Sequence, residues 1–179
     1  KLPIVVSMAN VAASGGYWVS TPADRIFAEP DTITGSIGVF GIIPSFDKAL
    51  GKIGVTADGI ATTPLSGQPD ILGGVNDTFN TLAQASVVDI YARFTGLVAK
   101  SRKQPIEKIR TIAEGRVWAG GTARQLGLVD QFGGLPDALA AAARLAKVKG
   151  DFHAKYFEEE PSEYSKILAG LLGNDTGQA

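Results

Sequence analysis

The segment Ala12-Ala13-Ser14-Gly15-Gly16-Tyr17-Trp18 follows an apolar run at residues 3–8 and decides the architecture of the chain. The run at 3–8 predicts a central strand, because it is short, apolar and bounded by proline and asparagine. Residues 11–16 are small and predict a turn, and the apolar residues 17–19 predict a buried helix. A serine between a strand and a helix exposes its hydroxyl where the helix N-terminus stabilises negative charge.

Predicted strands and helices alternate along the rest of the chain, which favours an α/β layered fold. Between residues 32 and 41, glycine recurs at every third position and predicts backbone turns and close approaches. Further strands are predicted at 25–28, 55–60, 128–130 and 153–157, an extended piece at 117–120, and helices at 45–53, 76–103, 105–114, 122–126, 135–148 and 162–172. The expected organisation is a core at 1–150, a strand and helix extension at 151–173 and a disordered tail at 174–179.

The composition excludes several classes of protein. The 179 residues are 45% apolar with a net charge of −1, which argues against disorder and against a dedicated nucleic-acid binder. The chain has no cysteine and a single histidine, His153, so cysteine nucleophiles, zinc-thiolate sites and histidine metal clusters are not expected. No cofactor and no metal are therefore predicted. No apolar run is long enough to cross a bilayer, and no secretory leader is recognisable.

Ser14 has two interpretations on the residues alone. It can be a nucleophile, or it can cap the helix that follows while the glycines allow tight packing. A nucleophilic serine needs a base, either His153, which lies among glutamates in a predicted edge strand, or a lysine whose pKa is lowered by burial. Most lysines lie at polar helix faces or helix ends.

An ordered set of short motifs resembles the SppA-type signal peptide peptidases. The resemblance covers residues 3–148 and rests on Ser7-Met8, Ala12 to Trp18, Ser20-Thr21-Pro22-Ala23, Thr34-Gly35-Ser36-Ile37-Gly38, Gly115-Arg116-Val117-Trp118 and Gly127-Leu128-Val129-Asp130. It implies a ClpP/crotonase-like fold, with a parallel sheet flanked by helices. It also implies a Ser/Lys dyad that degrades residual signal peptides at the membrane.

The resemblance also implies roles for particular residues. Ser14 matches the nucleophile, with its own N–H as one oxyanion donor, and Gly15 follows it in the catalytic turn. Ser36 matches the serine that orients the base lysine, although by itself it would be interpreted as a turn hydroxyl. Apolar signal-peptide remnants need an apolar groove, for which the candidates are Gly16, Tyr17, Ile33 and Val39, together with Trp18, Phe40 and Ile42.

One departure from the family pattern concerns the base. Short members carry the lysine in the loop that matches residues 61–67, but no lysine occurs here between Lys52 and Lys100. The chain therefore resembles the C-terminal unit of the long, two-unit members, with the base in a missing N-terminal unit. By itself it is expected to be inactive. The resemblance further implies a homo-oligomer on the periplasmic side of the inner membrane.

Three alternatives remain open. The first is a ClpP-class, membrane-associated protease with other substrates. The second is an acyl-CoA enzyme of the same fold, which would need an acid or base near the glycines and a basic patch for CoA. The third is a non-catalytic scaffold for assembly.

Overall fold

Parallel pairing of very short strands forms the first sheet of the chain. The computed structural model describes residues 2–157. β1 (Val5–Ser7) pairs in parallel with β3 (Arg25–Ala28), and β3 pairs in parallel with β6 (Gln131–Phe132). The predictions at 3–8 and 25–28 are confirmed. The strand expected at 128–130 forms instead at 131–132.

The second sheet holds the segment that precedes Ser14. β2 (Val11–Ala13) pairs in parallel with β4 (Ile33–Gly35), and β4 pairs antiparallel with β5 (Val117–Ala119). The expectation of turns throughout 11–16 and 32–41 was wrong for β2 and β4. Each strand has only three residues and lies beside glycines that indicate turns, but β4 forms because it has a partner on each side.

The helices begin and end within a few residues of the predicted positions. They are α1 (Gly15–Ser20), α2 (Asp47–Lys52), α3 (Asp77–Arg102), α4 (Ile106–Ile112), α5 (Gly120–Gln125) and α6 (Leu135–Leu145). The long helix α3 is bounded by its caps: the Asn76 side chain accepts a hydrogen bond from Phe79 N at 2.8 Å, and Lys103 takes the left-handed conformation. The α/β class with helices around parallel strands is thus confirmed.

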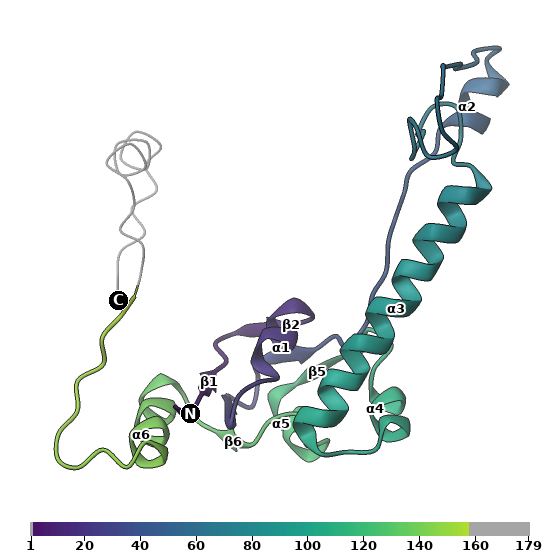
Figure 1. Cartoon of the computed structure of the whole chain (residues 1–179). Helices are drawn as coiled ribbons and strands as arrows, with labels where there is room; N and C mark the ends of the chain where they lie inside the picture. Colours follow the sequence, from purple (N-terminus) through teal and green to yellow (C-terminus); the bar gives the residue numbers. More distant parts are fainter. Residues whose placement is uncertain (1, 158–179) are drawn as a thin grey trace, which may run out of the picture. The chain divides into compact units, whose positions relative to one another are not determined.

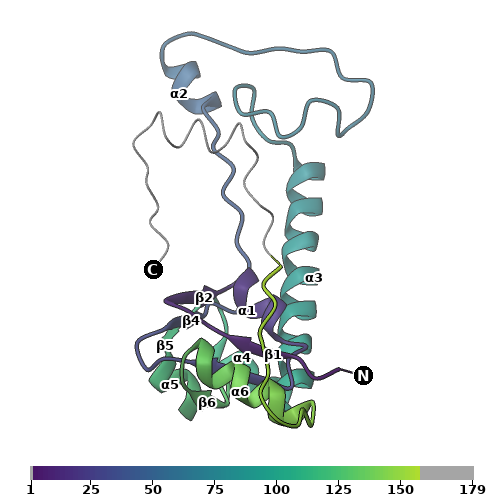
Figure 2. The same ribbon diagram turned by 90° about the vertical axis from the view of Figure 1, so that its left-hand side faces the viewer.

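The main core lies where α1, β3, the C-terminal half of α3, α4 and the segment after α5 meet (Figure 2). Its members are apolar and almost completely inaccessible to solvent. They are Met8, Tyr17, Ile26, Ala28, Ile37, Phe94, Val98, Ile109, Ile112, Ala113, Ala123, Leu128 and Val129. Residues from both sides of Ser14 therefore contribute to one core.

Helix α3 is buried only in its C-terminal half. Phe94, Thr95 and Val98 are buried, whereas Leu82 and Val88 in the preceding turns remain about half exposed. In Figure 1 the N-terminal half of α3 extends beyond the strands toward α2. The helix predicted at 76–103 is thus confirmed, with one half of it outside the core.

Two predicted strands do not form. Residues 55–60 and 153–157 are irregular, and large side chains such as Ile60 and Phe157 are exposed. An isolated extended segment is not stable in water without partner strands, and neither segment has one among residues 2–157. The chain divides into two compact units, Lys1–Val148 and Lys149–Ala179. The helix expected at 162–172 and the tail at 174–179 lie outside the described residues.

Length and apolar composition decide whether a helix can cross a membrane. None of the helices within residues 2–157 combines the length and the apolar composition that crossing a bilayer needs.

A close backbone contact joins two of the motifs that the sequence singled out. Gly115 N donates to Ile37 O at 3.1 Å, and a Cβ added to Gly38 would overlap the Gly115 backbone nitrogen. A side chain at position 38 is therefore excluded unless the backbone at 114–115 moves. This contact fixes the distance between the end of β4 and the turn after α4.

We expect Gly38→Ala to lower the free energy of unfolding by roughly 1–3 kcal/mol, the usual effect of overpacking. Gly41→Ala is the matched control, because a Cβ at Gly41 meets no atom within 4 Å. Urea denaturation of both variants measures the difference. Equal stability of the two variants would contradict the backbone contact.

Candidate active site

Ser14 lies on a strained turn between β2 and α1. Its backbone has φ 54° and ψ −115°, a conformation that L-residues with a side chain rarely adopt. Ser14 stands at the N-cap position of α1, yet its side chain makes no capping hydrogen bond. The capping interpretation is therefore wrong for its hydroxyl, which stays exposed at the head of the helix. Strained strand-to-helix turns of this kind present nucleophilic serines.

The backbone N–H of Ser14 is already used within the fold. It donates to Gly35 O at 2.9 Å, which continues the β2–β4 pairing by one residue. The expectation that this N–H is an oxyanion donor is corrected accordingly. The first N–H groups without a partner inside α1 belong to Gly15 and Gly16. Gly15 is exposed beside the serine, in open space where even a Cβ would meet nothing.

Ser36 reaches the same site from the end of β4. Its backbone is also left-handed, with φ 48°, and its N–H donates to Arg116 O at 2.8 Å. The preceding Gly35 has φ 77°, and its Cα lies against Trp118, where a Cβ would collide with the indole. Ser36 is thereby held half-buried by β4 and by the residues that precede β5.

A cavity of about 620 Å³ brings these two serines together. Most of its lining is aromatic, aliphatic or glycine, and it comes from the β2–α1 turn, the segment after β4, α3 and the turn after α4. The lining residues are Ser14, Gly15, Trp18, Ser36, Gly38, Val39, Phe40, Ile90, Tyr91, Phe94, Glu114 and Gly115. Trp18 packs on Phe94 with ring centroids 4.6 Å apart, which stabilises this wall.

The structure divides the predicted groove residues. Val39, Trp18 and Phe40 line the cavity, whereas Gly16, Ile33 and Ile42 do not. Gly16 faces Ala12 inside the β2–α1 unit, and Ile33 lies on β4 outside the cavity lining. Sequence reasoning missed Ile90, Tyr91, Phe94 and Glu114, because only the packing of α3 and α4 beside α1 brings them near Ser14. The one signal in the sequence was that Glu114 directly precedes the Gly115-Arg116-Val117-Trp118 motif.

Tyr17 is a core residue, and its assignment to the groove is corrected. Its side chain is completely buried, and its hydroxyl donates to Leu128 O at 2.8 Å. Burial raises the pKa of Tyr17 well above its ordinary value. Arg102 opposes this rise in the pKa and Asp130 adds to it. The phenol therefore remains a neutral hydrogen-bond donor.

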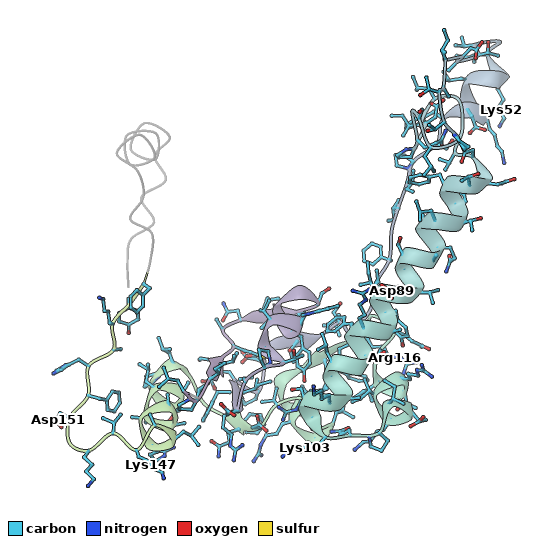
Figure 3. The ribbon with its side chains drawn as sticks, in the orientation of Figure 1. Lys52, Asp89, Lys103, Arg116, Lys147 and Asp151 are labelled. Atoms are coloured by element: carbon cyan, nitrogen blue, oxygen red, sulfur yellow. The ribbon has the colours of Figure 1, made fainter. Side chains whose placement is uncertain are left out.

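The described part of the cavity contains no lysine and no histidine. Its one carboxylate, Glu114, is ion-paired with Arg116 at 3.2 Å, and both side chains are more than half exposed. Figure 3 shows Lys52 on α2 and Lys103 at the C-terminal end of α3. Within residues 2–157, no group of three or more histidine, cysteine or carboxylate side chains could hold a metal.

A larger cavity, of about 910 Å³, lies beside the C-terminal end of α3. Its one serine, Ser101, donates its hydroxyl to Thr21 O at 2.6 Å, so this hydroxyl has a structural partner. Only the smaller cavity holds serines in strained backbone conformations. We therefore assign the candidate active site to the smaller cavity.

An exposed serine on a strained strand-to-helix turn, above parallel strands and beside an apolar cavity, defines a site of the serine-hydrolase class. The family follows from a comparison of sequences. A profile of Peptidase family S49 matches residues 1–149, and the chain belongs to this family, whose fold is ClpP-like.

Several relatives are similar over most of this chain. Protease 4 of Salmonella typhi is 44% identical over 172 residues, which cover 96% of this chain and 28% of the relative. Protease 4 of Haemophilus influenzae is 39% identical, over 88% of this chain and 26% of the relative. The putative signal peptide peptidase SppA of Enterococcus faecium is 35% identical, over 82% of this chain and 43% of the relative. The chain thus spans less than half the length of each.

The strain at Ser14 predicts an effect on stability. We expect Ser14→Gly to be more stable than Ser14→Ala by about 1 kcal/mol, because glycine adopts φ 54° without a Cβ clash. The comparison with alanine removes the hydroxyl from both proteins, so that the backbone is what differs. Thermal denaturation of the two variants measures the difference, and a more stable alanine variant would refute the strain.

The buried phenol predicts a pH dependence. Because the pKa of Tyr17 is raised by folding, the unfolded chain loses this proton first as the pH rises above about 10. The stabilisation is therefore complete below pH 10, and stability falls above it by up to about 1.4 kcal/mol per pH unit. Denaturant titrations of wild type and Tyr17→Phe between pH 8 and 11 test this. The phenylalanine variant should lack this part of the slope, and identical slopes would contradict the assignment.

Proposed function

We propose that this chain supplies the nucleophile of a serine endopeptidase that works with a Ser/Lys dyad. The observation that carries the proposal is Ser14, whose exposed hydroxyl has no capping role and opens on an apolar cavity. Membership of Peptidase family S49 supports the reaction class. The relatives named Protease 4 agree with it.

In the proposed reaction, Ser14 Oγ attacks the peptide carbonyl while its proton passes to a neutral lysine Nζ. The resulting oxyanion accepts a hydrogen bond from Gly15 N–H, at the positive end of α1. Collapse of the tetrahedral intermediate breaks the C–N bond, and the lysine returns the proton to the leaving amine. The same lysine then takes a proton from a water molecule, whose oxygen attacks the acyl carbon. The ester C–O bond breaks, the carboxylic acid product leaves and the lysine returns the proton to Ser14 Oγ.

The base comes from outside the described cavity in this proposal. No lysine is among the cavity-lining residues, and a serine hydroxyl by itself is a weak nucleophile at neutral pH. We place the lysine in a partner unit of the same fold that packs against the Ser14 face. Ser36, half-buried in the same cavity, would hydrogen-bond its amine and fix its direction.

The proposed substrates are apolar peptides in an extended conformation, and residual signal peptides are the expected source. Trp18, Val39 and Phe40 offer a wall that matches apolar side chains, and the cavity has only one ion pair, at Glu114. The relative in Enterococcus faecium carries the name of a putative signal peptide peptidase. Such substrates imply an enzyme at the periplasmic side of the inner membrane.

A homo-oligomer is part of the same proposal. Large apolar side chains between β4 and the middle of α3, such as Phe40, Ile42 and Ile53, are mostly exposed in the single chain. Exposed apolar surface of this extent favours contacts with other subunits. The near-neutral charge of the chain does not support a nucleic-acid partner.

The test uses the complete native protein that contains this sequence. We expect Ser14→Ala to lower kcat on an apolar peptide by roughly 10⁴-fold or more and to abolish labelling by a fluorophosphonate. Ser101→Ala is the control, because Ser101 lies in the other cavity and should keep full activity. Undiminished activity in Ser14→Ala would exclude Ser14 as the nucleophile, whereas a wild type that neither cleaves the peptide nor is labelled would favour a scaffold.

The origin of the base is tested separately with the 179-residue chain alone. We expect no turnover from it and no labelling, since the proposal places the lysine in another unit. Hydrolysis by this chain that disappears in Ser14→Ala would show that the base is internal. That result would refute the partner-unit part of the proposal and leave the serine peptidase intact.

A further inference from the structure

One buried hydrogen bond ties helix α1 to a segment more than a hundred residues away. The Tyr17 hydroxyl donates to Leu128 O at 2.8 Å, with both residues completely buried. Tyr17 follows Ser14 by three residues, and Trp18 N donates to Ser14 O at 2.9 Å to close the first turn of α1. The phenol therefore restrains the rotation of the helix that begins at the candidate nucleophile.

The segment that accepts this bond is itself held by an ion pair. Arg102 Nε donates to Gly127 O at 2.8 Å, and its two terminal nitrogens donate to the Asp130 carboxylate. The same carboxylate also accepts a hydrogen bond from Ile26 N at 2.7 Å, which connects the ion pair to strand β3. The Arg102 side chain is only 9% exposed, so the pair is largely shielded from water.

The opposite side of Ser14 is fixed by β4. Ser14 N donates to Gly35 O, so the serine lies between a strand on one side and the Tyr17 anchor on the other. A residue in a rare backbone conformation persists only when its surroundings over-determine it. Helix α1 has six residues, too few to hold its own orientation without tertiary contacts.

We propose that Tyr17, Arg102 and Asp130 are positioning residues for Ser14, acting through the Leu128 carbonyl and the rotation of α1. We call these three residues with Leu128 the α1 anchor. The inference rests on the proposed function of Ser14. None of the anchor side chains lines the Ser14 cavity, so they act on the direction of the hydroxyl and not on substrate contacts.

The α1 anchor makes a specific kinetic prediction for the complete native protein. Tyr17→Phe keeps the ring in the core and removes only the hydroxyl. We expect kcat and the rate of Ser14 labelling by a fluorophosphonate to fall together by about 10- to 100-fold, the scale of a misplaced reacting group. KM for an apolar peptide should stay within about twofold, because substrate contacts are unchanged.

Two control variants separate positioning from general destabilisation. Ile109→Val removes a methyl group from the same core on α4. It should lower the melting temperature while leaving the hydrogen bonds of the α1 anchor in place. Tyr156→Phe makes the same chemical change at an exposed tyrosine. Both should keep the wild-type labelling rate well below the melting temperature. If Ile109→Val slows labelling as much as Tyr17→Phe at matched stability, the α1 anchor is purely structural and the inference is overturned.

A third measurement decides the inference without activity. Hydrogen exchange of the residue 14–20 amides should be about tenfold faster in Tyr17→Phe than in Ile109→Val. Only the Tyr17→Phe substitution removes the hydrogen bond that restrains α1 locally. Unchanged exchange would overturn the α1 anchor even if activity fell. Should wild type resist labelling altogether, the proposed function of Ser14 fails, while the exchange rates still decide whether Tyr17 restrains α1.

The ion pair is tested by a double-mutant cycle. Asp130→Asn should slow the labelling of Ser14 in the wild-type background. It should have little further effect in Tyr17→Phe, since both substitutions act on Ser14 through the Leu128 carbonyl. Arg102→Lys should retain part of the rate, because lysine keeps the charge but not the three directed contacts. Fully additive effects of Asp130→Asn and Tyr17→Phe would show separate routes and contradict the inference.

Discussion

The hydrogen bond from Ser14 N–H to the Gly35 carbonyl is the contact on which the rest of the site depends. It continues the β2–β4 pairing one residue past the end of β2 and so places the start of α1 against β4. The same contact positions Ser36, which directly follows Gly35, near Ser14. It also uses the one N–H that sequence reasoning had assigned to the oxyanion. A single backbone bond thereby sets the distance between the two serines and is the reason why the proposed reaction uses Gly15 N–H for the oxyanion.

The elements that the sequence predicted well are those with local causes. β3 has three consecutive apolar, buried residues after Arg25, and α3 has a capping asparagine at its start and basic residues at its end. β2 and β4 were missed because each is only three residues long and is followed by glycines that indicate turns. They form because each finds a parallel or antiparallel neighbour. The strand expected at 55–60 begins with Val55 and Thr56 but contains Asp58-Gly59, and no partner strand lies beside it among residues 2–157.

The residues of the candidate site divide in the same way, into those with a signal in the nearby sequence and those placed only by packing. Ser14 could be suspected from its place between a predicted strand and a predicted helix. Ser36 was reached only through the family resemblance of its motif, since by itself it suits a turn hydroxyl. Tyr17 could not be placed, since an aromatic residue after a turn suits a groove or a core equally well. Its burial depends on Leu128, 111 positions away in the sequence. The α3 residues Tyr91 and Phe94 enter the site only through packing, which no local pattern records.

The contact between Gly38 and Gly115 has a consequence for how this site can change. Where two backbones touch, the width of the cavity is a property of the fold and not of side-chain rotamers. A substitution at Gly38 would push Glu114–Gly115 and the end of β4 apart and so disturb Ser36 at the same time. The shape of the cavity can therefore vary mainly through the side chains of Ile90, Tyr91 and Phe40, which also line it. The fold thus separates lining positions where side chains can vary from Gly38, where any side chain displaces neighbouring backbone.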